Sequence, residues 1–245
     1  MENKLRLKTL VNGYAGSGKS YHLLTYPKIA WLITEPGTEI LLETHPELKK
    51  NVVWMESFLP SPDEDIKTVF ERLQKAVVRA YADVKAGTIE TLGLDNASFL
   101  SENRWIYINK YERNLTNQGQ LNTLAMYGDL NRWLYQFFLL NITPFPGHVV
   151  VTCHEHEEKE DNVKTGNVSP DLLSGFRDTI DRMFSCSIYL DKKKVGENKY
   201  KYAARCQKGA GRNAKNRYGL PEVVEDISYD SIIKCINEAN NKISK

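Results

Sequence analysis

The chain has 245 residues, of which 41% are hydrophobic and 26% charged, and this composition excludes a chain that is mainly disordered. Lys and Arg number 33 against 31 Asp and Glu, so any nucleic-acid contact would need a local basic patch. The four cysteines form no CxxC pair, which argues against a disulfide framework or a zinc site and favours a reducing cytoplasm. The sequence has no apolar run long enough to span a bilayer, so we expect no membrane contact.

Apolar segments of strand length alternate with amphipathic segments through most of the chain. The expected strands cover residues 5–11, 29–33, 51–55, 89–94, 148–153 and 184–190. The expected helices cover residues 18–26, 63–85 and 121–140, a short stretch near Thr179, and residues 230–243. This alternation predicts βαβ units, and therefore an α/β fold with a mostly parallel sheet and helices on both faces.

The C-terminal part of the sequence shows a different pattern. Residues 154–169 are polar and are expected to form a loop. Residues 195–206 alternate around a Gly-Glu-Asn sequence, which predicts a hairpin and an antiparallel end to the sheet. We expect a core domain over residues 1–224 and a helical tail over 225–245 that packs on the core or trails from it.

Residues 13–20 read GYAGSGKS and match the phosphate-binding pattern G-x-x-x-x-G-K-[ST] in full. In such a loop the backbone N–H groups surround a phosphate, the Lys places a cation beside the β and γ oxygens, and the next hydroxyl binds Mg²⁺. The flanking strand and helix favour this interpretation over an ordinary glycine-rich turn. The residues expected to bind nucleotide are Gly13, Tyr14, Ala15, Gly16, Ser17, Gly18, Lys19, Ser20 and Tyr21.

A second metal-binding group is expected at the end of another strand. The segment 89–95 reads IETLGLD and ends in Asp95. We expect Asp95 to hold Mg²⁺ through its water shell, together with Ser20. The alternative is an Asp that ends the strand and caps the turn that follows.

With these two motifs in place, the chain resembles the RecA-like P-loop ATPases, and in particular the phage and prophage nucleotide-binding proteins of the Sak-type single-strand annealing group. The resemblance covers about residues 5–224, and only its phosphate-binding motif is highly specific. It implies a RecA-like core that binds ATP or ADP with Mg²⁺, acts on single-stranded DNA and assembles as a ring or filament of identical subunits. It also implies a phage- or prophage-encoded protein in the cytoplasm of a bacterial host.

The resemblance adds two residues to the catalytic set of Lys19 and Asp95. In RecA-like proteins the strand after the phosphate-binding helix ends in a glutamate that positions the attacking water, which here is Glu35, although a simple turn glutamate is equally compatible. A polar residue at the end of the strand after Asp95 senses the γ-phosphate, and here His154 replaces the more common Gln. Zinc binding by His154 and His156 lacks further ligands at a recognisable spacing, and a solvated strand-end histidine is the third possibility.

Residues 208–219 read KGAGRNAKNRYG and form the clearest basic patch. The resemblance implies that cations in this region reach a neighbouring subunit's γ-phosphate, whereas general electrostatics also allows DNA backbone contacts or a solvated loop. The candidates are Lys208, Arg212, Lys215 and Arg217, with Lys208 and Arg217 preferred.

Two further segments bear on DNA binding. Residues 103–120 interleave cations with aromatic rings, which suits unpaired bases, but a helix with its aromatics facing the core has the same composition. Residues 155–161 read EHEEKED and would repel phosphate, which argues against DNA binding by the segment after His154.

These observations favour a Mg²⁺-dependent ATPase that acts on single-stranded DNA in phage recombination or strand annealing, with slow hydrolysis that depends on DNA or assembly. A small-molecule or nucleoside kinase is the first alternative, although no arginine-bearing lid is recognisable. A nucleotide switch without recombination activity, such as a helicase loader or a terminase-associated factor, is the second.

Overall fold

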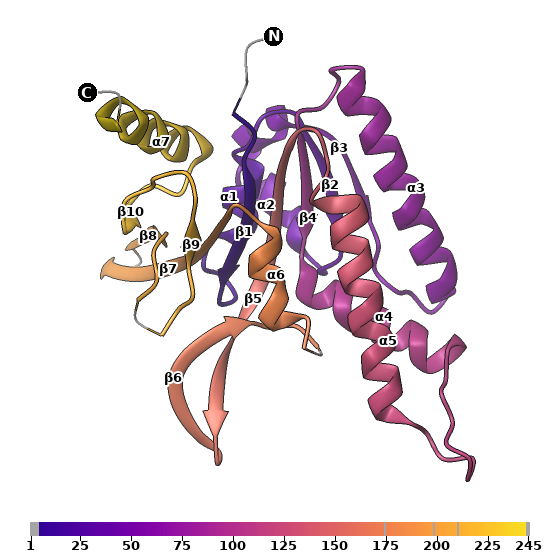
Figure 1. The fold of residues 1–245 in the computed structure, drawn as a ribbon. Coiled ribbons are helices and arrows are strands. Elements are labelled where there is room, and N and C mark those ends of the chain that lie inside the picture. The colour runs from indigo at the N-terminus through magenta and orange to yellow at the C-terminus, as the bar shows by residue number, and fades with distance from the viewer. Residues whose placement is uncertain (1–4, 174, 198, 210, 244–245) are drawn as a thin grey trace.

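One sheet organises the computed structural model, which describes residues 5–173, 175–197, 199–209 and 211–243 (Figure 1). Its parallel strands are, in spatial order, β3 (Val52–Ser57), β2 (Ile29–Ile33), β4 (Thr91–Asp95), β5 (His148–Glu160), β1 (Lys8–Gly13) and β7 (Cys186–Gly196). The antiparallel strands are β8 (Lys199–Arg205) and β10 (Val223–Val224), which extend the sheet beyond β7, and β9 (Lys215–Asn216), which also pairs with β7. The expected α/β fold, with a mostly parallel sheet and an antiparallel C-terminal portion, is confirmed.

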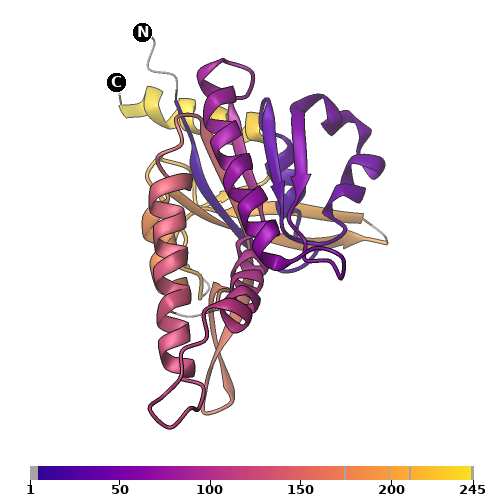
Figure 2. The same ribbon diagram turned by 90° about the vertical axis from the view of Figure 1, so that its right-hand side faces the viewer.

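Helices cover both faces of the sheet (Figures 1 and 2). One face carries α1 (Lys19–Leu24), α2 (Leu41–Thr44) and α7 (Tyr229–Ile243). The other carries α3 (Ile66–Lys85), α4 (Ala97–Tyr111), α5 (Thr123–Phe137) and α6 (Arg177–Met183). Short 3₁₀ turns at Thr38–Ile40 and Pro46–Asn51 flank α2, and a π-helical turn at Phe138–Ile142 follows α5.

Strand β2 contributes to the hydrophobic clusters on both faces. Ala30 and Leu32 point into the cluster under α3–α6, whereas Ile29, Trp31 and Ile33 point into the cluster under α1, α2 and α7. Alternate side chains of a strand face opposite sides, so a strand covered on both sides needs a continuous apolar run. Each large aliphatic side chain that is fully buried stabilises the fold by about 1.5–3 kcal/mol. The strand therefore needs apolar residues on both faces, and the resulting run made this segment recognisable from sequence.

The long helix α3 shows how local sequence sets the ends of an element. Asp65 caps it by accepting a hydrogen bond from the backbone N–H of Lys67 at 2.8 Å. Its buried side chains recur every three or four residues from Ile66 to Ala80 and form one stripe against the sheet. The expected amphipathic helix over 63–85 is confirmed, with its first turn shortened to begin at Ile66.

The prediction of a polar loop over residues 154–169 is wrong. Strand β5 continues to Glu160 and returns as β6 (Val163–Pro170), and the two form an antiparallel hairpin that projects from the sheet (Figure 1). Asp161 and Asn162 make the turn with positive φ angles of 50° and 64°, which short polar side chains tolerate. The outer half of the hairpin is exposed on both faces, so it lacks the apolar alternation that identifies a strand.

The C-terminal segment packs on the core through α1. The backbone N–H of Tyr229 donates to the Thr25 hydroxyl at 2.8 Å, and the Tyr229 ring lies 4.8 Å from that of Tyr26. Ile232 and Ile236 of α7 are buried in the same cluster. These contacts pack the described part of the tail, residues 225–243, on the core, while a domain limit at residue 224 stays a prediction. Among the described residues, none of the helices combines the length and apolar character needed to cross a bilayer.

Candidate functional site

The glycine-rich loop lies between β1 and α1 and needs glycine at several positions. Gly16 and Gly18 have φ angles of 72° and 95°, in the left-handed region that side chains disfavour. A Cβ atom at Gly13 would collide with the Ser17 hydroxyl and lie 3.1 Å from the carbonyl oxygen of Leu190, so a side chain there would force Ser17 to move. The loop therefore has the strand–turn–helix context that the motif requires.

Gly18 allows a direct test of this loop geometry. Gly18→Ala is expected to reduce the free energy of unfolding by about 1–3 kcal/mol, because the alanine must adopt a left-handed conformation and its Cβ would lie 2.9 Å from Ile227 Cδ1. Urea denaturation measures the change. The matched control is Gly128→Ala within α5, where nothing lies within 4 Å and the substitution should stabilise by about 0.5–1 kcal/mol. Equal effects of the two substitutions would contradict a constrained loop.

The Lys19 ammonium is held at the mouth of the loop. Lys19 is 5% exposed, and its Nζ donates to the carbonyl oxygens of Gly13 at 2.8 Å and Tyr14 at 2.9 Å. Burial is the largest influence on its pKa and lowers it, while the carboxylates of Glu35 and Asp95 oppose the shift. A cation that is poorly hydrated and aimed at a loop of this type is well placed to bind phosphate.

Asp95 lies at the end of β4, fully buried. The hydroxyl of Thr152 donates to Oδ1 of Asp95, whereas Oδ2 has no partner of good geometry among the described residues. Burial raises the pKa of Asp95, and the nearby Thr152 and Ser20 hydroxyls act against that shift. A buried carboxylate oxygen without a partner beside the Ser20 hydroxyl fits Mg²⁺, which prefers few protein ligands and keeps several waters. Ser20 and Asp95 are therefore the residues that would hold the ion.

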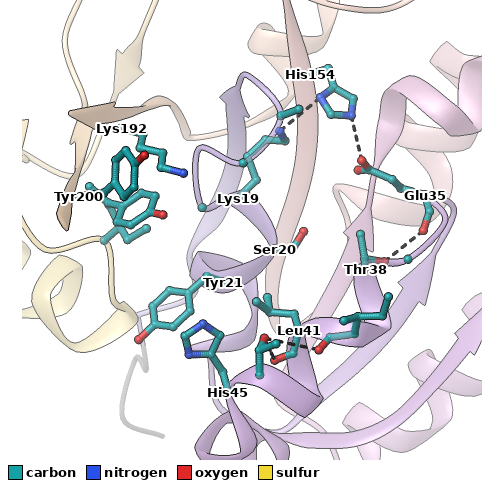
Figure 3. A pocket seen from close by; sticks show the side chains of 18 of the residues that line it. Lys19, Ser20, Tyr21, Glu35, Thr38, Leu41, His45, His154, Lys192 and Tyr200 are labelled. Carbon is teal, nitrogen blue, oxygen red and sulfur yellow. Dashed lines mark hydrogen bonds and ion pairs between the residues drawn. The ribbon is translucent and has the colours of Figure 1, made fainter. Parts of the chain in front are cut away.

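Glu35, two residues beyond the end of β2, and His154 lie side by side; His154 was expected at a strand end but lies in the middle of β5, which continues to Glu160. His154 Nε2 lies 3.2 Å from Glu35 Oε1, and its Nδ1 lies 3.3 Å from Lys19 Nζ (Figure 3). The amide of Asn96 donates to Glu35 Oε2. Both ring nitrogens of His154 therefore have partners within the site, and neither is free for zinc.

The same contacts determine the charge of Glu35. Partial burial alone would raise the pKa of its carboxyl group, but the hydrogen bond and charge of His154, the Lys19 cation and the Asn96 amide together hold that pKa below its usual value. Glu35 is therefore ionised at neutral pH and can accept a proton.

A cavity of about 900 Å³ opens from the glycine-rich loop (Figure 3). Glu35 and His154 line it at one end, beside Lys19 and Ser20. Further from Lys19, its walls come from α1 and α2 on one side and from the β7–β8 hairpin on the other. A volume in this range accommodates a small-molecule ligand.

The structure corrects the assignment of two cations in the 208–219 segment. Arg212 pairs with Glu155 and Asp191, each at 2.9 Å, and its side chain is 12% exposed. Lys215 donates to three carbonyl oxygens at the end of α6, including Phe184 O at 2.7 Å. Because both side chains bind groups of their own chain, neither is available to contact DNA or a neighbouring subunit. Lys208 and Arg217 are exposed and remain candidates.

The Arg212 ion pair is expected to stabilise the fold. Arg212→Met leaves the Glu155 side chain, which is 0% exposed, buried without its partner, and should cost about 3–5 kcal/mol of unfolding free energy. Thermal or urea denaturation checks this, with the exposed Lys208→Ala as a control expected to change stability by less than about 0.5 kcal/mol. Adding Glu155→Gln to Arg212→Met should restore part of the loss; no loss in the single variant would contradict a structural role.

The 103–120 segment forms the second half of α4 and a following loop; Trp105 and Tyr107 pack against the core, whereas Tyr111 is 43% exposed. Arg104 is 8% exposed, binds the Glu112 carboxylate at 2.6 Å and lies 4.2 Å from the Tyr107 ring centre. The Trp105 ring stacks on Tyr127 at 4.3 Å. This packing favours the core-facing interpretation of the segment over a surface that stacks DNA bases.

Sequence reasoning missed several residues of the site. Asn96 and Thr152, which hold Glu35 and Asp95, each adjoin an assigned strand end but belong to no motif. Lys192, Tyr200 and Tyr202 line the cavity from the β7–β8 hairpin. Tyr200 and Tyr202 fall in the expected hairpin over 195–206, where alternation puts them on one face, but Lys192 lies before it and reaches that face only through the pairing of β7 with β8.

The phosphate-binding loop joins β1 to α1 at the carboxyl ends of the parallel strands, and a buried Asp lies two strands away. These features define the P-loop nucleoside triphosphatase class of proteins. A family model described as an AAA domain (AAA_24) matches residues 5–218, and the chain belongs to this family. Its coverage of most of the chain confirms the P-loop ATPase class implied by the sequence motif.

Comparisons with other proteins add little detail. No curated protein matches. Similar solved structures include a KaiC-like protein from Pyrococcus horikoshii OT3, with 13% identity over 82% of this chain and 78% of that chain and a TM-score of 0.41. An ATPase from the type III secretion system of pathogenic bacteria has 15% identity, 76% and 51% coverage and a TM-score of 0.47. The RadB recombinase has 18% identity, 81% and 79% coverage and a TM-score of 0.39.

Proposed function

We propose that the chain is a Mg²⁺-dependent ATPase that acts on single-stranded DNA in phage recombination or strand annealing. The observation that carries the ATPase part is the contact of one histidine with two groups: His154 touches the phosphate-loop Lys19 at 3.3 Å and the ionised Glu35 at 3.2 Å. A cation, a proton acceptor and a hydrogen-bonding sensor at one mouth of a phosphate loop suit hydrolysis of a triphosphate.

Each residue has a distinct role in this proposal. Lys19 binds the β and γ oxygens, and Glu35 orients the attacking water and accepts its proton. His154 exchanges its contact with Lys19 for the γ-phosphate and thereby reports whether that phosphate is present. Mg²⁺, held by Ser20 and Asp95, would offset phosphate charge.

The DNA part of the proposal rests on the sequence resemblance to the Sak-type group and on the exposed cations Lys208 and Arg217. Their positions in a segment rich in small residues suit contact with a DNA backbone or with the γ-phosphate of a neighbouring subunit in a ring or filament. The membership of the Sak-type group and the phage origin belong to the same proposal.

The test is the ATPase rate with and without single-stranded DNA, measured alongside molecular mass in the presence of ATP and Mg²⁺. We expect stimulation by single-stranded DNA and a larger assembly with ATP. Turnover that requires a nucleoside or metabolite acceptor would instead identify a kinase. Nucleotide binding that DNA leaves unchanged, without strand annealing, would identify a nucleotide switch and contradict the DNA part.

A further inference from the structure

The β7–β8 hairpin presents one mixed face of lysines and tyrosines. Lys192 pairs in register with Tyr202, and Lys194 with Tyr200. Residues directly opposite each other, and residues two apart, share a face of a hairpin, so these four side chains lie together. The Lys192 ammonium lies 4.1 Å from the centre of the Tyr200 ring and 5.8 Å from that of Tyr202.

This face is fixed against the phosphate loop. A Cβ atom at Gly18 would lie 3.2 Å from Tyr202 Cδ1, so the Tyr202 ring packs directly on the loop. Lys192 and Tyr200 come next along the same face, and both line the cavity that begins at Lys19 (Figure 3). Tyr200 is 47% exposed, so its ring is accessible to a ligand in the cavity.

The opposite wall of the cavity is also aromatic. Tyr21 directly follows Ser20, the last residue of the phosphate-binding motif, and its ring lies 5.2 Å from the His45 ring at 74°. The cavity continues from Lys19 past Ser20 into the space between Tyr21 and the hairpin (Figure 3), so a nucleotide with its triphosphate at Lys19 would place its sugar and base there.

Several polar groups that line this part of the cavity already have partners in the chain. The Thr38 hydroxyl donates to Glu35 O at 3.1 Å, and the Thr44 hydroxyl donates to Leu41 O at 3.2 Å. Glu225 pairs with Lys201 at 2.7 Å. These groups are poorly available to read the edge of a base, whereas ring faces stack on any base.

We propose that the β7–β8 hairpin completes the nucleotide site within a single chain. Tyr200 stacks on the base opposite Tyr21 and His45, and Lys192 binds the phosphates as a second cation beside Lys19. The site therefore accepts ATP and GTP with similar affinity and binds them without a neighbouring subunit. This inference rests on the proposed function, because it takes the phosphate loop to be occupied by a nucleoside triphosphate.

Calorimetric titration with ATP, GTP and inorganic tripolyphosphate separates the two roles. Lys192→Ala should weaken binding of all three compounds by about tenfold or more, since a charge-assisted contact is lost. Tyr200→Ala should weaken ATP and GTP by about tenfold or more and leave tripolyphosphate unchanged, whereas Tyr200→Phe should retain nucleotide binding. Wild-type affinities for ATP and GTP should agree within about tenfold and should not depend on protein concentration.

The matched control is Lys193→Ala, which removes the same charge from the same hairpin but on the opposite face. Both Lys192 and Tyr200 are exposed, so circular dichroism should show unchanged folding in their variants. Wild-type binding in Lys192→Ala and Tyr200→Ala, with binding lost in Lys19→Ala, would overturn this inference and leave the proposed function intact. A wild-type protein that binds no nucleotide would overturn both, and a preference of more than about tenfold between ATP and GTP would refute stacking as the basis of base recognition.

Discussion

Lys19→Ala is expected to abolish detectable nucleotide binding and to reduce ATP turnover by at least about 10²–10³-fold, the usual effect of removing one group that stabilises transition-state charge. The buried Lys19 ammonium is aimed into the loop by the carbonyl oxygens of Gly13 and Tyr14, so its loss removes the cation closest to the phosphates. Calorimetry with ATP and Mg²⁺ and a phosphate-release assay measure the two effects.

Two controls make this result decisive. Lys75→Ala removes an exposed lysine from α3 and should leave binding and turnover unchanged. Thermal denaturation of the Lys19→Ala protein separates lost binding from lost folding, because Lys19 also contributes two hydrogen bonds within the loop. Undiminished hydrolysis in Lys19→Ala, after rigorous removal of contaminating ATPases, would exclude the glycine-rich loop as the site.

Glu35→Gln is expected to lower the rate of ATP hydrolysis by about 10²–10⁴-fold while changing ATP affinity only slightly. The substitution keeps the shape of the side chain but removes the group that accepts a proton from water. Single-turnover hydrolysis and calorimetry distinguish the two quantities. Glu39→Gln, on the exposed 3₁₀ turn a few residues later, is the matched control and should behave as wild type.

The pKa of Glu35 gives this prediction a pH dependence. Because the folded-state pKa lies below the ordinary value of 4.5, the proton-accepting form persists as pH falls to about that value. Loss of turnover caused by Glu35 protonation should therefore begin only below the ordinary glutamate range. A Glu35→Gln protein that hydrolyses ATP at the wild-type rate would show that another group positions the water.

The parts of the fold that were predictable depend on short-range patterns. Strand β2 needs a continuous apolar run because both of its faces are buried, and α3 needs a stripe because only one of its faces is. The phosphate loop was equally recognisable, because each of its glycines is favoured locally, either by limited space or by a positive φ angle. To place Glu35 and His154 beside Lys19, one must know which strands are neighbours in the sheet. The family resemblance supplied that order.

The failures come from contacts between residues far apart in the sequence. Arg212 resembles a free surface cation, but Glu155, which neutralises it, lies 57 residues earlier in the chain. The β5–β6 hairpin carries no apolar pattern because it extends into solvent, so its sequence is typical of a loop. Tyr200 was expected in a hairpin but not in a site, and Lys192 lay outside the expected elements, because only folding places the β7–β8 hairpin over the phosphate loop.

The central position of β1 has a consequence for how the chain is made. Lys8 pairs with Val149 and Thr9 with Cys186, so β1 lies between two strands that are synthesised much later than itself. Pairings of such large sequence separation form slowly, and domains made vectorially from the N-terminus cannot complete them early. The nascent phosphate loop therefore waits, with its flanking strand unpaired, until β5 and β7 have emerged, and α7 closes over α1 later still.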